Sequence, residues 1–342
     1  MQREVLKLGV TAGDPAGIGP EVALKSINAL DDHSIIPILI GRATALEKNY
    51  PGLFSGYEII SRQDEKPVPG KKYLLDVPLD LPVPKPGGGT IDTGREALAC
   101  IDAAIELWRS GAIDAVVTAP VSKGLIEKTG VHFTGHTEYM AEKIGEADRP
   151  LMMMFSEKYR VLLASTHVPV SGVTGSLGLD RILAVIRAGY ASIRSIDGGA
   201  VRLAITGLDP HCGDDGAIGT FDREVTSRAV AIAREEKIPV EGPFAADTLF
   251  IPSVWERYSL VIAQYHDQGL IPFKMLAFDE GVNVTLGLSM VRTSVDHGTA
   301  FGIAGNNMAR WSSMTEAIML ARRLASVRGG QATSRRGCHT AP

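Results

Sequence analysis

Three of the eight histidines follow the end of an apolar run in which a strand is expected. His167 ends VLLASTH, His211 follows RLAITGLDP, and His266 follows LVIAQY. Ligands of open α/β sheets bind beyond the carboxyl ends of the strands, so three imidazoles at such an edge can converge on one cation. Three histidines bind divalent metals and leave positions open for a substrate. This pattern predicts a metal site, with Asp214 and Asp267 as acceptors that orient the imidazoles.

The alternative for each histidine is a loop residue that makes one hydrogen bond. Spacing does not show that three distant segments meet, and the set could also be completed across a subunit interface. Both interpretations stay open at the level of the residues.

Two glycine-rich stretches provide a second kind of chemistry. TAGDPAGIGPE, residues 11–21, follows the first expected strand and opens a helix, with Pro20 at a first helical position. Its glycines do not have the G-x-G-x-x-G spacing of a dinucleotide fingerprint. The loop still allows close backbone approach at a helix N-terminus, so Gly13 and Asp14 are candidates for an anion or cofactor edge. The alternative is a tight strand-to-helix turn.

A third group of residues has the chemistry of a phosphate clamp. Lys123 follows a strand end, and His136 and Thr137 lie where a helix is expected to begin, a position that favours anions. Further along, Lys274, Asn283 and Arg292 add two cations and an amide. The alternatives are a threonine helix cap and solvated surface charge.

Short apolar runs alternate with helical patterns along the chain. Continuous apolar character predicts strands covered on both faces, and the alternation indicates an α/β fold with a largely parallel sheet. The strands are expected at residues 5–11, 35–40, 113–118, 160–166, 201–206 and 260–265. In TGREALACIDAAIELWRSG, Thr93 and Glu96 predict a capping box and Gly111 a helix end. Residues 328–342 predict an irregular tail.

Composition excludes several classes of protein. The 342 residues suit two domains or one large α/β unit, and a net charge of −4 does not favour nucleic acid or an anionic membrane. No apolar run approaches the ~20 residues of a membrane helix, and no signal-peptide core is apparent. The odd number of cysteines, 3, favours a reducing cytoplasm over a disulfide framework.

Several motifs together resemble the 4-hydroxythreonine-4-phosphate dehydrogenase family. They are GDPAGIGPE, TAPVSKG, TGHTE, STH, DPHCGD, ADTLF, YHDQGLIPFK, GVNVTLGL and RTSVDHGTAFGIAG, and they span residues from about 7 to about 325. The resemblance implies an isocitrate/isopropylmalate dehydrogenase-like fold of two α/β domains with a cleft between them. Residues 1–130 with 291–327 would form the cofactor-side domain, and 131–290 the metal, substrate and dimerisation domain. It also implies a homodimer whose subunits share the active site.

The resemblance assigns roles to the candidates. His167, His211 and His266 match the ligands of one divalent metal, zinc, magnesium or cobalt. His136, Thr137, Lys274, Asn283 and Arg292 match the substrate contacts. The residues that match the loop on the adenosine side of NAD or NADP are His297, Gly298, Thr299 and Ala300.

The implied reaction is the oxidation of 4-phosphooxy-L-threonine to 2-amino-3-oxo-4-phosphooxybutanoate, which loses CO₂ to give 3-amino-2-oxopropyl phosphate for pyridoxal phosphate synthesis. Asp247 is the candidate general base and Lys123 the alternative. Within the family, the alternative activity is 4-phospho-D-threonate 3-dehydrogenase. From other classes, a metal-dependent phosphohydrolase and a non-catalytic metal-binding module compete with it. NADH formation from the phosphorylated substrate distinguishes these possibilities.

Overall fold

The computed structural model describes residues 5–61, 67–146 and 150–336, with side chains described as far as residue 328. The chain divides into two compact units. The terminal unit contains Met1–Pro150 and Leu288–Pro342, and the central unit contains Leu151–Gly287. Residues 131–150, expected in the central domain, thus lie in the terminal unit with His136 and Thr137.

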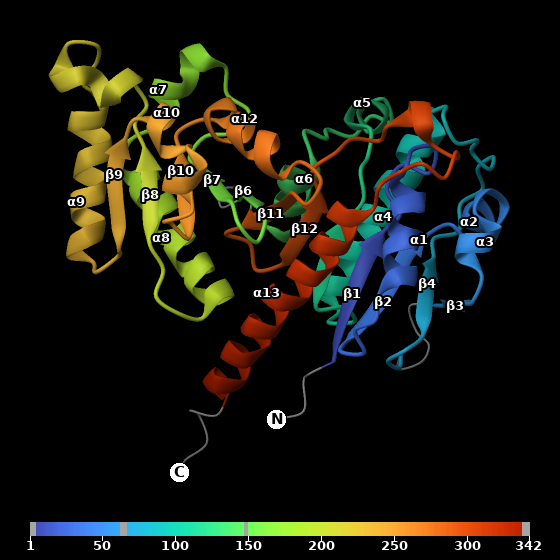
Figure 1. The fold of residues 1–342 in the computed structure, drawn as a ribbon. Coiled ribbons are helices and arrows are strands. Elements are labelled where there is room, and N and C mark those ends of the chain that lie inside the picture. Colours follow the sequence, from blue (N-terminus) through green and yellow to red (C-terminus); the bar gives the residue numbers. More distant parts are fainter. Residues whose placement is uncertain (1–4, 62–66, 147–149, 337–342) are drawn as a thin grey trace. The chain divides into compact units, whose positions relative to one another are not determined.

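The terminal unit is built on six strands in the order β3-β4-β2-β1-β5-β12 (Figure 1). All neighbours in this series pair in parallel. The strands are β1 (Leu6–Thr11), β2 (Ile35–Gly41), β3 (Tyr57–Ile60), β4 (Lys72–Asp76), β5 (Ala115–Thr118) and β12 (Val291–Val295). Strands β1, β2, β5 and β12 are almost wholly buried, as their continuous apolar sequences predict.

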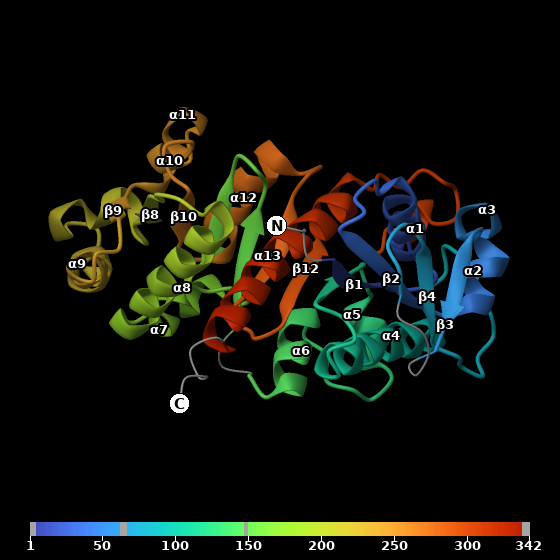
Figure 2. The same ribbon diagram turned by 90° about the horizontal axis from the view of Figure 1, so that it is seen from below.

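Helices cover both faces of this sheet. On one face α4 contacts β1, β2 and β5 and packs on α5 and α6, and on the other face α13 contacts β1, β5, β12 and α1 (Figure 2). Ile101 and Ile105 of α4 lie in the core with Ile38 and Ile40 of β2. The helical segments of the unit are α1 (Gly19–Ala29), α2 (Ala43–Asn49), α3 (Pro51–Phe54), α4 (Ile91–Arg109), α5 (Lys123–Glu127), α6 (His136–Ile144), η4 (Phe301–Ile303) and α13 (Ser312–Arg336).

The central unit has a mixed set of strands in the order β11-β6-β7-β10-β8-β9. β6 pairs antiparallel with β11 and β7, and β7, β10, β8 and β9 run parallel. Their bounds are β6 (Leu151–Phe155), β7 (Arg160–Leu163), β8 (Leu203–Thr206), β9 (Val240–Phe244), β10 (Leu260–Ala263) and β11 (Val282–Leu286). Trp255 and Phe273 are fully buried and fill the core beside Val261 of β10.

Short and long helical segments connect these strands. The long ones are α8 (Leu179–Asp197), α9 (Ser227–Glu235) and α12 (His266–Ala277). The short ones are η1 (Val170–Gly172), α7 (Val173–Ser176), η2 (Pro210–Gly216), η3 (Asp222–Thr226), α10 (Ala246–Leu249) and α11 (Pro252–Trp255). Nowhere in the described part of the chain is a helix both long and apolar enough to span a membrane.

The predicted α/β class is confirmed, and each of the six predicted strands is present, most of them shorter than predicted. Two details are corrected. The cap of α4 is Thr90, whose hydroxyl accepts from the N–H of Thr93, whereas Glu96 pairs with Arg42. Helix α13 continues to Arg336, through the first part of the predicted tail. Residues 337–342 lie outside the described residues.

Candidate active site

In the terminal unit, the guanidinium of Arg292 connects β12 to two other elements. Its Nη2 and Nε donate to the hydroxyl of Thr118, at the end of β5, over 2.7 and 3.2 Å. Its Nη1 donates to the hydroxyl of Thr137 in the first turn of α6, 3.1 Å away. Arg292 is only 3% exposed, and burial lowers its pKa to about 10, so it still carries its charge at neutral pH. A buried cation held in place by hydroxyl groups is suited to bind an anion.

His136 opens α6 beside this cation. Its ring packs edge-on against the buried ring of Phe133, with 5.8 Å between the centroids. Burial, with the charges of Arg292 and Lys123 adding to it, lowers the pKa of His136 well below its ordinary value. The neutral ring has a buried Nε2 with no hydrogen-bond partner among the described residues. His136 therefore presents an unused polar atom at a helix N-terminus.

Lys123 supplies a second charge near the same helix. A Cβ placed on Gly135, the residue before α6, would lie 3.4 Å from Lys123 Nζ and 2.8 Å from Glu138 Oε2. The predicted residues Lys123, His136, Thr137 and Arg292 are thus brought together at the start of α6. We call these four residues the α6 cation cluster.

The loop after β1 is joined to the predicted cofactor loop. The N–H of Ile18 donates to the carbonyl of Thr299 over 2.9 Å, and a Cβ on Gly17 would lie 2.8 Å from that oxygen. Glycine is required there by this close approach. Asp14 is buried and accepts from the N–H of Ala16, and burial raises its pKa. Gly13 has a φ of 72°, and the backbone N–H of Asp14 donates to the carbonyl of Pro120. Gly13 and Asp14 therefore form a turn that is held to the segment after β5.

His297 begins the predicted cofactor loop and is neutral. Burial lowers its pKa, and its Nδ1 lies 3.1 Å from the carbonyl of Gly298, to which only a protonated nitrogen can donate. The other nitrogen, Nε2, is therefore an acceptor, and it is buried without a partner in the described structure. Thr299 is half-buried and Ala300 is exposed, with Ala300 in the left-handed region at a φ of 42°.

In the central unit, two of the three predicted metal ligands approach each other. The ring centroids of His167 and His266 are 5.9 Å apart. His266 is the first residue of α12. Its Nδ1 lies 2.7 Å from Oδ1 of Asp267, the predicted acceptor, so the tautomer that donates to this carboxylate has Nε2 free to bind a metal.

His211 lies in an unusual backbone conformation. Residues 211–215 all have positive φ angles, from 45° at Asp214 to 87° at Gly213. Non-glycine residues rarely adopt this left-handed region, and successive ones store strain. A Cβ on Gly213 would lie 2.2 Å from the carbonyl oxygen of Gly219, so that position requires glycine. Strained segments of this kind are found at functional sites, where the surrounding structure holds them.

Asp222, which is fully buried, holds the beginning of the His211 segment. Its carboxylate accepts from the N–H groups of Leu208 and Asp209, both at 2.9–3.0 Å, and from the hydroxyl of Thr226 at 2.9 Å. Across residues 5–61, 67–146 and 150–336, however, no three His, Cys, Asp or Glu side chains gather closely enough to hold a metal within one chain. His211 thus does not join the histidine pair in the single chain.

Two glutamines connect the three histidine-bearing segments. Gln264 is fully buried. Its backbone carbonyl accepts from Ser165 Oγ at 2.8 Å, and its side-chain Nε2 donates to the backbone carbonyl of Thr206 at 2.9 Å. Gln268 Oε1 accepts from the N–H of Gln264 and the hydroxyl of Thr206, and its Nε2 donates to Gly207. These residues precede or flank His167, His211 and His266. We call Gln264 and Gln268, with their partners Ser165, Thr206 and Gly207, the glutamine network. No motif in the sequence predicted it.

The remaining predicted residues lie on separate elements. Asp247 is exposed in the first turn of α10, and its charge contributes to raising the pKa of Cys212, after burial and Asp222, so it lies near the His211 segment. Lys274 is half-buried in the last turn of α12. Asn283 lies on β11, and its Oδ1 is buried without a partner in the described part of the chain.

Comparison with known proteins gives relatives that span nearly the full chain. A 4-hydroxythreonine-4-phosphate dehydrogenase from Chromobacterium violaceum is 41% identical over 334 residues, 94% of this chain and 98% of its own. One from Methylorubrum populi is 40% identical, covering 93% and 94%. The crystal structure of the dehydrogenase of that name from Klebsiella pneumoniae superposes with a TM-score of 0.81 at 33% identity, covering 95% of this chain and 100% of its own.

These relatives define the chain as an α/β protein of a dehydrogenase class, that is, an oxidoreductase. A family model described as "Pyridoxal phosphate biosynthetic protein PdxA" matches residues 33–321. The chain belongs to this family, as the sequence motifs predict.

Proposed function

We propose that this chain catalyses the NAD-dependent, metal-dependent oxidation of 4-phosphooxy-L-threonine at C3. The product, 2-amino-3-oxo-4-phosphooxybutanoate, is a β-keto acid that loses CO₂ to give 3-amino-2-oxopropyl phosphate, a precursor of pyridoxal phosphate. The proposal rests on the name and high coverage of the relatives together with the α6 cation cluster.

The observation that carries the proposal is the position of Arg292. Its buried charge, the ammonium of Lys123 and the first turn of α6 all favour a dianion at the same place. A phosphate bound there would accept from Arg292 and Thr137. His136, kept neutral, would donate or accept through Nε2 without adding to the desolvated positive charge. Anchoring the phosphate positions the C3 alcohol for reaction, with binding energy from a part of the substrate that does not react.

His167 and His266 are suited to hold a divalent metal. The two rings are close, and Asp267 orients His266 as carboxylates orient metal-binding imidazoles. When bound, zinc, magnesium or cobalt lowers the pKa of an alcohol and polarises a ketone. The third ligand is His211 of a second copy of the chain, as the resemblance implies, which accounts for the incomplete set in one chain.

A second copy also accounts for an apolar face on α12. Ile271, Met275 and Phe278 are all more than half exposed and have the i, i+4, i+7 spacing of one helix face. Such an exposed group is typical of an interface. We propose that this face belongs to the homodimer interface, next to the helix start that carries His266.

The cofactor side uses the loop at residues 297–300. It would hold NAD or NADP, which would supply the acceptor for the hydride of C3. His297 Nε2 is a buried acceptor in need of a donor, and Thr299 fixes this loop to the start of α1. Such an orphaned polar atom suits a bound ligand that supplies the donor. Gly13 and Asp14 would line the same side through the turn that packs on Pro120.

The alcohol proton requires a base. Asp247 is the first candidate because it lies near the His211 segment and is exposed to solvent that can take the proton on. Lys123 is the alternative from the α6 cation cluster. Lys274 and Asn283 would complete the substrate contacts, Asn283 through its unpartnered Oδ1.

One assay tests the proposal. NADH absorbance is followed with 4-phosphooxy-L-threonine, with and without a chelator, and with 4-phospho-D-threonate in parallel. We expect chelator-sensitive NADH formation from the first substrate. Preference for the second would assign the other activity of the family, and release of inorganic phosphate without NADH would contradict both.

A further inference from the structure

The helix that carries Asp222 begins with an irregular turn, η3. The N–H of Ser227 donates to the carbonyl of Asp222, five residues before it, which is the hydrogen bond of a π-helix. The turn continues directly into α9. A π turn contains one residue more than an α-helical turn, and such insertions are frequent at functional sites. The residues at its two ends, Asp222 and Thr226, are both buried.

The hydroxyl of Thr226 lies between a carboxylate and an amide. It donates to Asp222 Oδ1 over 2.9 Å, and it accepts from Gln264 Nε2 over 3.3 Å. The other hydrogen of this amide nitrogen goes to the carbonyl of Thr206, 2.9 Å away. Because the nitrogen offers Thr226 only a hydrogen, the proton of the hydroxyl is directed to Asp222. One hydroxyl group thus connects Asp222 to the glutamine network.

On one side of this hydroxyl, Asp222 fixes the start of the left-handed segment at residues 211–215. Its carboxylate accepts from the N–H groups of the two residues that follow Gly207, at 2.9–3.0 Å. A Cβ on Gly207 would lie 2.7 Å from Cys212 Sγ and 3.1 Å from Asp222 Oδ2. The segment that presents His211 is therefore folded closely against this carboxylate.

On the other side, Gln264 follows β10 directly and precedes His266 by two positions. Its backbone N–H donates to Gln268 Oε1 over 2.8 Å. Its backbone carbonyl accepts from Ser165 Oγ, two positions before His167, also over 2.8 Å. Gln264 is thus fixed to both strand ends that present the histidine pair.

Stability alone does not account for the buried amide of Gln264. Its Oε1 has no hydrogen-bond partner among the described residues. A buried amide oxygen without a donor is costly, and an apolar side chain of similar size would avoid that cost. What the amide provides is geometry, because its nitrogen reaches Thr206 and Thr226 at once. Local arrangements that cost stability are typical of functional positions.

We propose that Thr226 is a positioning residue of the metal site. Through Asp222 it fixes the segment that presents His211, and through Gln264 it holds that segment at a set distance from the strand ends that present the histidine pair. The inference rests on the proposed function, since it concerns the metal of the same site. All of these bonds lie within the central unit of one chain, so each copy positions its own His211 for the histidine pair of the partner copy.

Three substitutions isolate the hydroxyl. Thr226→Val removes it and keeps the branched shape of the side chain, whereas Thr226→Ser keeps the hydroxyl. Thr293→Val is the matched control, because Thr293 is equally buried and its hydroxyl donates to the carbonyl of Ala317 over 2.8 Å in the terminal unit. Circular dichroism and thermal unfolding check that all three variants are folded.

Titration of the metal-free full chain with Co²⁺ measures metal affinity without turnover, and the visible absorption of bound cobalt reports its ligands. We expect Thr226→Val to bind Co²⁺ about 10- to 100-fold more weakly than wild type, as loss of an outer partner does. Its cobalt spectrum should match that of His211→Ala. Thr226→Ser should recover most of the affinity, and Thr293→Val should bind as wild type does.

A double substitution tests whether Thr226 acts through His211. If it does, adding Thr226→Val to His211→Ala should weaken Co²⁺ binding little further, because the two losses are not independent. In the metal-free protein, Thr226→Val should speed hydrogen exchange at the amides of Leu208 and Asp209, which donate to Asp222. Absent Co²⁺ binding by wild type, wild-type affinity in Thr226→Val, an equal loss in Thr293→Val, additive losses or unchanged exchange would overturn the proposal.

Turnover separates this inference from the proposed function. If NADH forms from 4-phosphooxy-L-threonine in a chelator-sensitive way while Thr226→Val keeps the wild-type Co²⁺ affinity, the role of Thr226 fails and the proposed function stands. If Co²⁺ binding depends on Thr226 and His211 as described but no substrate yields NADH, the proposed function fails and the positioning of the metal ligands stands.

Discussion

Arg292 and Thr137 are 155 positions apart in the sequence, and a hydrogen bond of 3.1 Å joins their side chains. The bond connects β12 to the first turn of α6. The buried guanidinium of Arg292 thus lies beside the N-terminus of this helix, and both favour an anion. The predicted phosphate contacts of the terminal unit depend on this connection.

Replacing Arg292 with alanine should raise the KM for the phosphorylated substrate by about 10- to 100-fold, the value of charge-assisted hydrogen bonds. Arg292→Lys should recover part of the loss, because it restores charge without the two-pronged geometry. Steady-state kinetics give both values. Arg95→Ala, at an exposed arginine of α4, is the control. An unchanged KM in Arg292→Ala would remove Arg292 from the phosphate site.

Replacing His211 with alanine should abolish metal-dependent turnover and leave the protein folded, because the residue is exposed and contributes little to the core. Metal content after dialysis and NADH formation measure the effect. His132→Ala, at another exposed histidine, is the control. Full activity and full metal content in His211→Ala would end the ligand assignment.

His136 should make the protein less stable in acid. Its folded-state pKa lies well below the ordinary value of about 6.5, so the unfolded chain takes up a proton that the folded chain does not. The free energy of unfolding therefore falls as the pH drops below about 6.5, by up to about 1.4 kcal/mol per pH unit for this group. Urea unfolding between pH 7.5 and 5 should show a shallower loss in His136→Asn. Parallel curves for the variant and the wild type would show that His136 takes up its proton in the folded state.

The glutamine network should support metal binding. Gln264→Ala leaves the buried carbonyl of Thr206 without its side-chain donor, at a cost of about 1–3 kcal/mol, and should weaken metal affinity about 10- to 100-fold, as loss of outer partners does. Urea unfolding and metal titration measure the two effects. Ile186→Val, in the core of the same unit, costs about 1 kcal/mol and is the control for stability alone. Equal metal affinity in both variants would make Gln264 purely structural.

The exposed face of α12 should control assembly. Met275 is 80% exposed in the single chain, so Met275→Glu costs little in a monomer but places a charge in an apolar interface. Sedimentation analysis should show a dimer for wild type and a monomer for the variant. Met308→Glu, 68% exposed in the terminal unit, is the control. A dimeric Met275→Glu would place the interface elsewhere.

Much of the fold could be predicted because buried strands have continuous apolar sequences. Strands such as β1, β5 and β10 are continuous apolar runs, and the start of α6 at His136 follows its Thr-Gly signal. The antiparallel strand β6 reads LMMMF and differs little in pattern from a buried helix segment, so it was missed. A local sequence pattern indicates whether a segment is buried and whether it has helical or strand periodicity, but it does not indicate which strand pairs with which.

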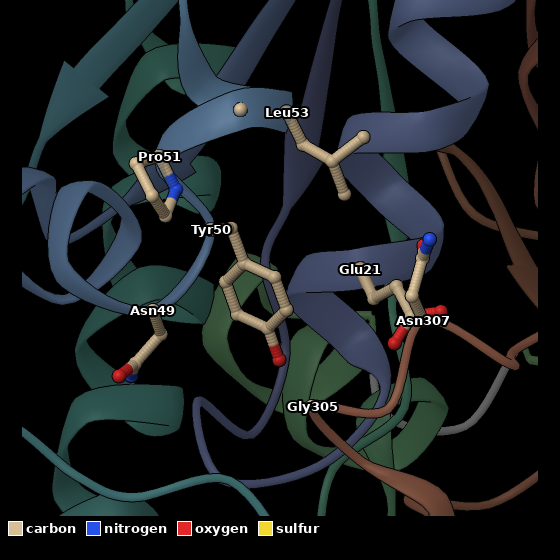
Figure 3. A pocket seen from close by; sticks show the side chains of 8 residues that line it. Glu21, Asn49, Tyr50, Pro51, Leu53, Gly305 and Asn307 are labelled. Carbon is tan, nitrogen blue, oxygen red and sulfur yellow. The ribbon is translucent and has the colours of Figure 1, made fainter.

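The site was predicted in part for a similar reason. Residue chemistry points to Arg292 and His136, and the structure brings both together. The left-handed run at 211–215 has only one inner glycine, Gly213, and its conformation is imposed by Asp222 and the surrounding contacts. Gln264 could have been noticed as a polar residue that ends an apolar strand two positions before His266. Glu21 ends the glycine-rich stretch at residues 11–21, whereas Tyr50 lies in no motif, and only packing brings the two to one pocket of the terminal unit (Figure 3).

The order of the segments has a consequence for synthesis on the ribosome. The terminal unit needs β12, which pairs with β5, and that strand leaves the exit tunnel after the whole central unit. The middle of the chain can therefore fold while translation continues, and the first 150 residues must wait for the last 55. A nascent chain truncated before Arg292 has no guanidinium to donate to Thr137 in the first turn of α6, so an incomplete product lacks the cation of the proposed phosphate site.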